Sequence, residues 1–204
     1  MESRAASYRP PQQDRSRRAL ARVLTAAENV LVAQGIDDFT MSAVAEQADV
    51  SVGAIYRRFE GRDQLLQAVN DQLLAKMEQN LAAALNTAPH DLAGVVRALV
   101  GAAVDDLSHN RAFPVLYGPG NALTPRVHDA ITTRRRLFLD AVEPYLGEVR
   151  RSDARQAVVV VQAMVTGTCV HRASQGPGVD DGLTWNTFAE QVEQMAMTYL
   201  LAPS

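Results

Sequence analysis

Apolar residues recur at intervals of three and four positions through most of this chain, and this spacing constrains the fold more than any other feature. In the first segment they fall at Leu20, Val23, Leu24, Ala27 and Val30, which form one stripe on a helix. Strand-like alternation is weak, and no internal repeat is visible. The pattern therefore predicts an all-α protein of eight or nine helices.

Glycine, proline and capping residues divide this pattern into separate helices. Gly35 is placed to end the first helix, Thr40 and Ser51 to cap the second and third, and a break at 60–62 precedes a long helix from about residue 63. Further helices are expected at about 89–109, 126–146, 152–174 and 184–201. The second and third helices are expected to end at about Gln47 and Arg58, and the Pro/Gly-rich segment 111–124 to be kinked.

Composition narrows the class of protein. Of the 204 residues, 47% are hydrophobic, which suffices for a packed core, and the formal net charge of −3 gives no general attraction to nucleic acid. A single cysteine excludes an internal disulfide and a Cys-rich zinc site. Residues 1–18 lack the apolar core of a signal peptide, and the longest apolar stretch, Ala157–Val170, is shorter than the roughly 20 residues that span a bilayer. We therefore expect a cytoplasmic protein with no membrane partner.

The stretch 40–62, TMSAVAEQADVSVGAIYRRFEGR, has the pattern of a helix-turn-helix unit. Two short helices are separated by three or four residues, and the small residue Ala45 stands where they would cross. Val44, Val50 and Ile55 are the apolar residues expected to hold the two helices together. The unit predicts a three-helix domain near the N-terminus.

The second helix of this unit is amphipathic in a way that suits DNA. At 100° per residue, Ile55 and Phe59 lie within about 40° of each other, while Arg57 lies about 200° from Ile55. One face is then apolar and buried, and the other presents Gly53, Tyr56 and Arg57. Because the major groove admits one α-helix, we interpret this segment as a recognition helix.

At this point the sequence resembles the DNA-binding domain of the TetR family of transcriptional regulators. The resemblance covers about residues 14–68 and rests on Gly35, Phe39-Thr40, Ala45, Val50-Ser51, Gly53, Ile55-Tyr56, Phe59 and Arg62. Asp49 departs from the glycine usual in the family, at a position where a left-handed backbone is expected and which Asp tolerates better than most residues. Arg62 replaces the commoner lysine.

The resemblance implies which residues contact an operator. They are Thr40, Ser42, Ser51, Val52, Gly53, Ala54, Tyr56, Arg57, Arg58 and Arg62. We assign phosphate contacts mainly to Thr40, Tyr56, Arg58 and Arg62, and base reading to Val52, Ala54 and Arg57. Arg57 is the first candidate for specificity, because arginine on guanine is the commonest specific contact.

The distribution of charge supports this interpretation independently. Residues 4–22 contain six arginines and one acid, residues 23–50 contain five acids and no base, and residues 51–62 contain three arginines and one acid. Positive charge therefore collects where the resemblance places DNA. We divide the chain into a flexible basic arm (1–13), a helix-turn-helix DNA-binding domain (14–62) and a helical domain (63–204).

In the resembling family the C-terminal domain binds a small effector and dimerises through its last two helices. The corresponding stripes here are Val158, Val161 and Val165 on one helix and Phe188, Val192, Met195 and Tyr199 on the other. Such stripes fit a four-helix interface between two copies, and packing in the chain's own core is the competing explanation. Candidate effector residues are Tyr117, His128, Met164, Thr168, His171 and Trp185.

Catalytic and metal-binding patterns are weak. Cys169 and His171 are two residues apart, so on a helix they point about 200° apart and cannot form a dyad. The histidines never occur at i, i+4, and we expect neither a metal, nor a cofactor, nor an enzyme. The sequence thus predicts a homodimeric repressor that leaves a palindromic double-stranded DNA operator when a small molecule binds. An activator with the same domain and a helical binding protein without DNA function are the alternatives.

Overall fold

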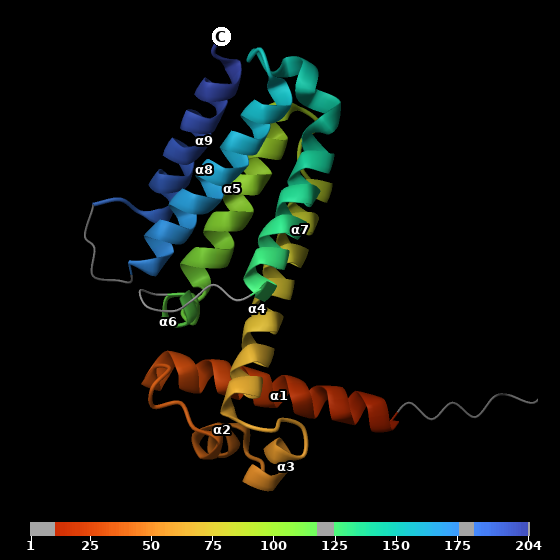
Figure 1. Ribbon diagram of the computed structural model, residues 1–204, viewed down its shortest axis with the longest axis vertical. Coiled ribbons are helices and arrows are strands. Elements are labelled where there is room, and N and C mark those ends of the chain that lie inside the picture. Colours follow the sequence, from red (N-terminus) through yellow and green to blue (C-terminus); the bar gives the residue numbers. More distant parts are fainter. Residues whose placement is uncertain (1–10, 118–124, 176–181, 204) are drawn as a thin grey trace, which may run out of the picture. The chain divides into compact units, whose positions relative to one another are not determined.

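The computed structural model describes residues 11–117, 125–175 and 182–203 of the chain (Figure 1). In these ranges every regular element is a helix, which confirms the predicted all-α class. The chain divides into two compact units, Met1–Asn70 and Asp71–Ser204, and the division falls within helix α4 (Arg62–Asn86). Within the described ranges, no helix combines the length and the apolar character needed to cross a membrane.

Helix α1 (Pro11–Gln34) opens the first unit. It begins earlier than the predicted arm of residues 1–13 allows, because proline, which lacks an N–H group, fits the first position of a helix. The rest of that arm, residues 1–10, lies outside the described residues. Gly35 ends α1 as predicted: its φ is +80° and its N–H donates to the Leu31 carbonyl at 2.9 Å.

The turn between α2 (Met41–Ala48) and α3 (Val52–Tyr56) is closed by a Schellman motif. Asp49 has the left-handed conformation predicted for it, with φ 52° and ψ 54°. Its N–H donates to the Glu46 carbonyl at 3.2 Å, and the Val50 N–H donates to the Ala45 carbonyl at 3.0 Å. This turn fixes where α3 begins.

Capping side chains also set these two helices. The Thr40 hydroxyl accepts a hydrogen bond from the Ala43 N–H, and the Ser51 hydroxyl accepts one from the Ala54 N–H, both at 3.2 Å. Both caps were predicted from the sequence. The helix α3 ends at Tyr56, two residues earlier than expected, although the N–H of Phe59 still donates to the Ile55 carbonyl at 3.0 Å.

The second unit contains most of α4 with α5 (Leu92–His109), α6 (Phe113–Tyr117), α7 (Pro125–Val142), the 3₁₀ helix η1 (Glu143–Glu148), α8 (Ala154–Ser174) and α9 (Trp185–Leu201). Helices α5, α8 and α9 lie side by side (Figure 1) and pack against one another. Their shared core is built largely from valine, leucine and alanine, with Phe138 fully buried. This unit has its own hydrophobic core, independent of the first.

Two helix boundaries in this unit differ from the prediction for local reasons. Helix α5 begins at Leu92 instead of residue 89, because Asp91 caps it by accepting from the Gly94 N–H at 2.6 Å. The helix predicted over 126–146 ends at Val142 and continues as η1, where Pro144 cannot donate the next helical hydrogen bond. Of the predicted kinked segment 111–124, residues 113–117 form α6 and 118–124 lie outside the described residues.

Four of the seven residues of the predicted dimer stripes lie in the core of a single chain. Val158, Val161, Val165 and Val192 have no exposed surface within a single chain and belong to its own core. A side chain already enclosed by its own subunit cannot contact a second copy, so core packing is the correct explanation for these four. Of the other three, Phe188 and Tyr199 are half-buried and Met195 is exposed.

Candidate functional site

In the first unit, one face of α3 is exposed and the opposite face is buried. Ile55 and Phe59 point into the core with 0% and 7% exposure, while Val52 and Tyr56 on the other side are 37% and 53% exposed. This division is the one that the 100° spacing predicts. Helix α3 therefore offers a face whose side chains have no partner element among the described residues of its own unit.

Small residues keep this face accessible. Gly53 is exposed, and a Cβ atom added there would meet nothing within 4 Å. Ala54 is half-buried beside it. A nucleic acid can thus approach the α3 backbone between the larger side chains of Val52 and Tyr56, as an α-helix in the major groove requires.

Hydroxyl groups at the helix starts remain able to bind phosphate. The Thr40 and Ser51 oxygens accept the capping hydrogen bonds described above, so each hydroxyl proton is still available to a phosphate oxygen. Ser42 is exposed on the first turn of α2. The caps thus hold both hydroxyls in place on the exposed side of the unit.

Of the three predicted arginines, Arg57 and Arg58 are exposed, and Arg58 and Arg62 make hydrogen bonds within the unit. Arg57 is exposed at the end of α3. The Arg58 guanidinium donates to the Ser16 hydroxyl at 2.9 Å and to the Ser16 carbonyl at 3.3 Å, which joins the segment directly after α3 to α1. Arg58 therefore positions the recognition helix as well as carrying charge.

Arg62 also has a structural role that the sequence did not reveal. Its Nε donates to the Phe39 carbonyl at 3.0 Å, and its terminal nitrogen donates to the Ile36 carbonyl. These bonds tie the start of α4 to the loop between α1 and α2. A planar guanidinium can hold two carbonyls at once, which explains arginine at this position better than charge alone.

The positive charge of α1 extends the interface. Arg17, Arg18 and Arg22 are exposed on α1, in the segment where the sequence already showed an excess of arginine. Arg17, Arg18 and Arg22 were outside the predicted site, and their clustering with few acids was the signal that could have included them. Cationic side chains of this kind bind phosphates without reading sequence.

The six predicted effector residues have different surroundings among the described residues. The Tyr117 ring packs on Phe113 with a centroid distance of 4.7 Å, and Trp185 packs edge-on against Phe188 at 5.7 Å. His128 and His171 are exposed, and the Thr168 hydroxyl bonds to the Met164 carbonyl of its own helix. None of the six lines either of the two cavities described below.

The second unit contains a buried ion pair that was not predicted from the sequence. Asp106 of α5 and Arg134 of α7 lie 3.1 Å apart, with side chains only 1% and 12% exposed. The Asn80 amide donates to the other Asp106 oxygen at 2.7 Å, and Arg134 donates to the Met77 carbonyl of α4. Burial raises the pKa of Asp106, while the bond from Asn80 and the charge of Arg134 oppose that rise.

Cys169 lies in the same core, on a different face of α8 from His171. The cysteine is fully buried and the histidine is exposed, so the two occupy different faces of the helix. Burial raises the pKa of the Cys169 thiol to about 11, which keeps it protonated at neutral pH. In the described part of the chain, no three His, Cys, Asp or Glu side chains are grouped to hold a metal ion.

The fold and this interface define a class: a helical protein of two units with a helix-turn-helix in the first. Residues 23–69 match the model of the bacterial regulatory proteins of the tetR family. The match runs from the middle of α1 to the first turns of α4 and includes the whole helix-turn-helix pair. The regulator SrpR of Pseudomonas putida is 46% identical over 48 residues, which cover 24% of this chain but only 22% of SrpR.

Solved structures extend the likeness beyond the first unit. A TetR-family regulator from Streptomyces coelicolor is 25% identical with a TM-score of 0.67, covering 90% of this chain and 96% of that one. FadR from Bacillus subtilis, solved in complex with stearoyl-CoA, has a TM-score of 0.71 at 14% identity, covering 88% and 98%. The second of these comparisons concerns the fold alone.

Proposed function

We propose that this protein is a sequence-specific DNA-binding transcriptional regulator, a repressor released from a palindromic operator by a small molecule. The observation that carries this proposal is the exposed face of α3, with Val52, Gly53, Tyr56 and Arg57 opposite the buried Ile55. The family match over residues 23–69 supports it. A protein acting on bacterial promoters works in the cytoplasm, and we assign no catalytic activity to it.

On this proposal, the contacts of α3 divide into two kinds. Thr40, Tyr56, Arg58 and Arg62 hold phosphates and set the register. Val52, Ala54 and Arg57 face base edges. Arg57 can donate two hydrogen bonds to O6 and N7 of a guanine, a pairing worth about 1–3 kcal/mol of discrimination. Specificity therefore depends on very few side chains.

The proposal is tested by fluorescence anisotropy with DNA that flanks the protein's own gene, against shuffled DNA of equal length. Arg57→Ala is expected to relax the preference at one base position and to cost about 1–3 kcal/mol on the preferred site. Arg150→Ala, which removes an exposed arginine from the second unit, is the matched control and should bind as the parent does. Equal affinity of the parent for flanking and shuffled DNA would contradict the proposal.

A homodimer fits this function, because a two-fold protein reads two half-sites. On α8, the residues opposite the buried valines are Val160, Ala163 and Gly167, all exposed and spaced three and four apart. On α9, Met195 is 49% exposed. We place the contact between copies on these outward residues, in place of the buried stripe.

Release by a small molecule would act through the second unit. FadR, which shares this fold, was solved with stearoyl-CoA, which supports a ligand-binding role for the helical unit. The effector would shift the population toward a form whose recognition helices no longer match the operator. The expected result is that a small molecule which raises the melting temperature also lowers operator affinity.

A further inference from the structure

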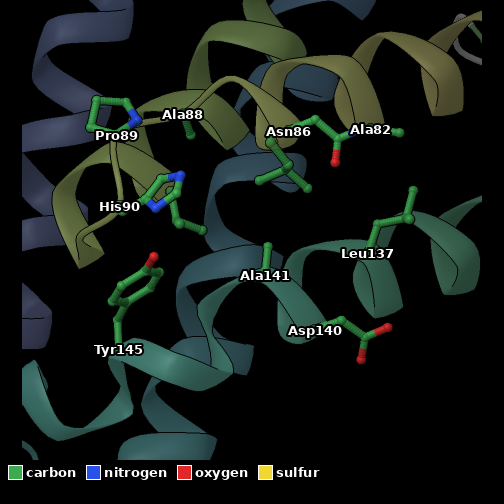
Figure 2. A pocket seen from close by; sticks show the side chains of 11 residues that line it. Ala82, Asn86, Ala88, Pro89, His90, Leu137, Asp140, Ala141 and Tyr145 are labelled. Carbon is green, nitrogen blue, oxygen red and sulfur yellow. The ribbon is translucent and has the colours of Figure 1, made fainter.

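A cavity in the second unit lies between the end of α4, the start of α5, the end of α7 and η1 (Figure 2). Its volume is about 390 Å³, within the range of about 300–1,000 Å³ typical of small-molecule pockets. Leu85, Val95, Leu137 and Ala141 form apolar walls from three different helices. None of the predicted effector residues lines it.

Polar groups stand at two sides of these apolar walls. Figure 2 shows the Tyr145 hydroxyl directed toward the ring of His90, with Asp140 farther along α7. In the described part of the chain, none of these three side chains makes a hydrogen bond or ion pair with another residue. Their polar atoms are therefore available to a bound molecule.

The wall that carries His90 is held rigidly. The Asp91 N–H donates to the Pro89 carbonyl at 2.9 Å, and the Asp91 carboxylate accepts from the Gly94 N–H at 2.6 Å. A Cβ atom at Gly94 would overlap the Pro89 carbonyl, so only glycine allows α5 to approach this closely. Glu148 of η1 accepts from the Leu92 N–H at 3.3 Å and fastens the opposite wall. A preformed cavity of this kind loses little entropy when a ligand enters.

The negatively charged residues at and beside the cavity favour a cationic ligand. Asp140 is the charged lining residue, Asp91 and Glu148 stand next to the lining residues, and no described lining residue is Lys or Arg. Arg135, Arg136 and Arg155 line a separate cavity of about 470 Å³ that shares Asp140. In the described part of the chain, no arginine forms an ion pair with Asp140, so the carboxylate is open to a cation.

We propose that this cavity binds a small organic amine, with its apolar body between Leu85, Val95 and Leu137 and its ammonium group on Asp140. The Tyr145 ring and hydroxyl lie on the same cavity and provide a further contact for a cation. The cavity lies in the second unit, through which the proposed release by a small molecule would act, and in naming the class of ligand this inference rests on that part of the proposed function.

The test uses three probes of nearly equal shape on the full chain: 2-phenylethylamine, 2-phenylethanol and phenylacetate. Isothermal titration and NMR shifts of the Tyr145 and His90 rings report binding. The amine is expected to bind, and the alcohol and the acid to bind at least about tenfold more weakly, because only the amine gives a charge-assisted bond to Asp140. Equal affinity for the three probes would overturn the proposal.

Two substitutions test the carboxylate of Asp140 and the apolar walls of the cavity separately. Asp140→Asn should weaken the amine about tenfold and leave the alcohol unchanged, whereas Asp129→Asn, an exposed change elsewhere on α7, should alter neither. Ala141→Leu, which fills the cavity, should abolish binding of all three probes while the thermal transition is kept. An unchanged amine affinity in Asp140→Asn or in Ala141→Leu would refute the site. These assays contain no DNA, so a failure of the ligand site is distinguishable from a failure of operator binding.

Discussion

At the scale of single residues, Asp49 shows how a local conformation makes the helix-turn-helix possible. It is the one non-glycine residue in the described part of the chain with a positive φ, and it closes the Schellman motif after α2. A residue with a Cβ atom is strained in this conformation, and Asp is among those that tolerate it. The turn thus carries a small and removable energetic cost.

Asp49→Gly is expected to stabilise the protein by about 0.5–1 kcal/mol, because glycine adopts the left-handed conformation without strain. Asp49→Ala should destabilise it by a similar amount, since alanine has neither the flexibility of glycine nor a polar side chain. Urea denaturation followed by circular dichroism measures both. An alanine variant more stable than the glycine variant would show that strain at this turn is absent.

Cys169 gives a second prediction for a single residue. Because its pKa is about 11 against an ordinary 9.0, the thiolate population at pH 8 should be about 100-fold lower than that of a free thiol. Burial adds to this protection, so a thiol reagent such as DTNB should react only as the protein unfolds. Between about pH 9 and 11 the folded state keeps a proton that the unfolded state loses, so stability should fall as pH rises.

The control for this prediction is Cys169→Ala, which should lose that part of the pH dependence. An equal pH dependence of stability in the parent and in the variant would show that groups other than Cys169 cause it. Rapid release of one equivalent of chromophore from the folded parent would show that the thiol is accessible.

At the scale of elements, the ion pair between Asp106 and Arg134 links α5 to α7, and Arg134 reaches α4 as well. Both charges are buried, so removing one partner leaves the other without compensation. A pair of this kind contributes less to net stability than to the choice of one arrangement of the helices. We expect the Asp106–Arg134 pair to act in this way here.

Arg134→Met alone is expected to cost about 3–5 kcal/mol, because Asp106 is then buried without its cation. The double variant Asp106→Leu/Arg134→Met should recover most of that loss. Arg97→Met, which breaks the exposed pair with Glu193 at 3.0 Å, should cost at most about 1 kcal/mol. Chemical denaturation of the four proteins measures the coupling, and a double variant no more stable than Arg134→Met would contradict it.

At the scale of the whole molecule, each unit has its own hydrophobic core and a different task. Ile55 and Phe39 anchor the core of the first unit, while Phe138 and the valines of α8 anchor that of the second. The outward residues of α8 and α9, in particular Val160 and Met195, remain exposed on a single chain. A second copy is the partner we propose for them.

Val160→Glu is expected to convert a dimer into a monomer, because a charge in an apolar contact between copies is left without a partner. Gln79→Glu adds the same charge at an exposed position on α4 and should leave the mass unchanged. Light scattering after size exclusion gives the mass of both. A dimeric Val160→Glu protein would place the interface elsewhere, and a monomeric parent would remove the proposal of a dimer.

The sequence alone determined the local structure of the first unit. Gly35, Thr40 and Ser51 could be assigned to helix ends, and Asp49 to a left-handed turn, because each acts through backbone groups within five residues. The buried side of α3 followed from the same short-range geometry.

Only the tertiary structure decided which side of α8 faces inward and which side chains meet in the second unit. Helix α8 has apolar residues around most of its circumference, so spacing gave no reason to prefer Val160 over Val161 as the outward residue. Asp106 and Arg134 are far apart in the chain, and no local pattern joins them. The cavity at Tyr145 and His90 likewise exists only because separate helices meet there, and packing between distant segments leaves no short-range signal in a single sequence.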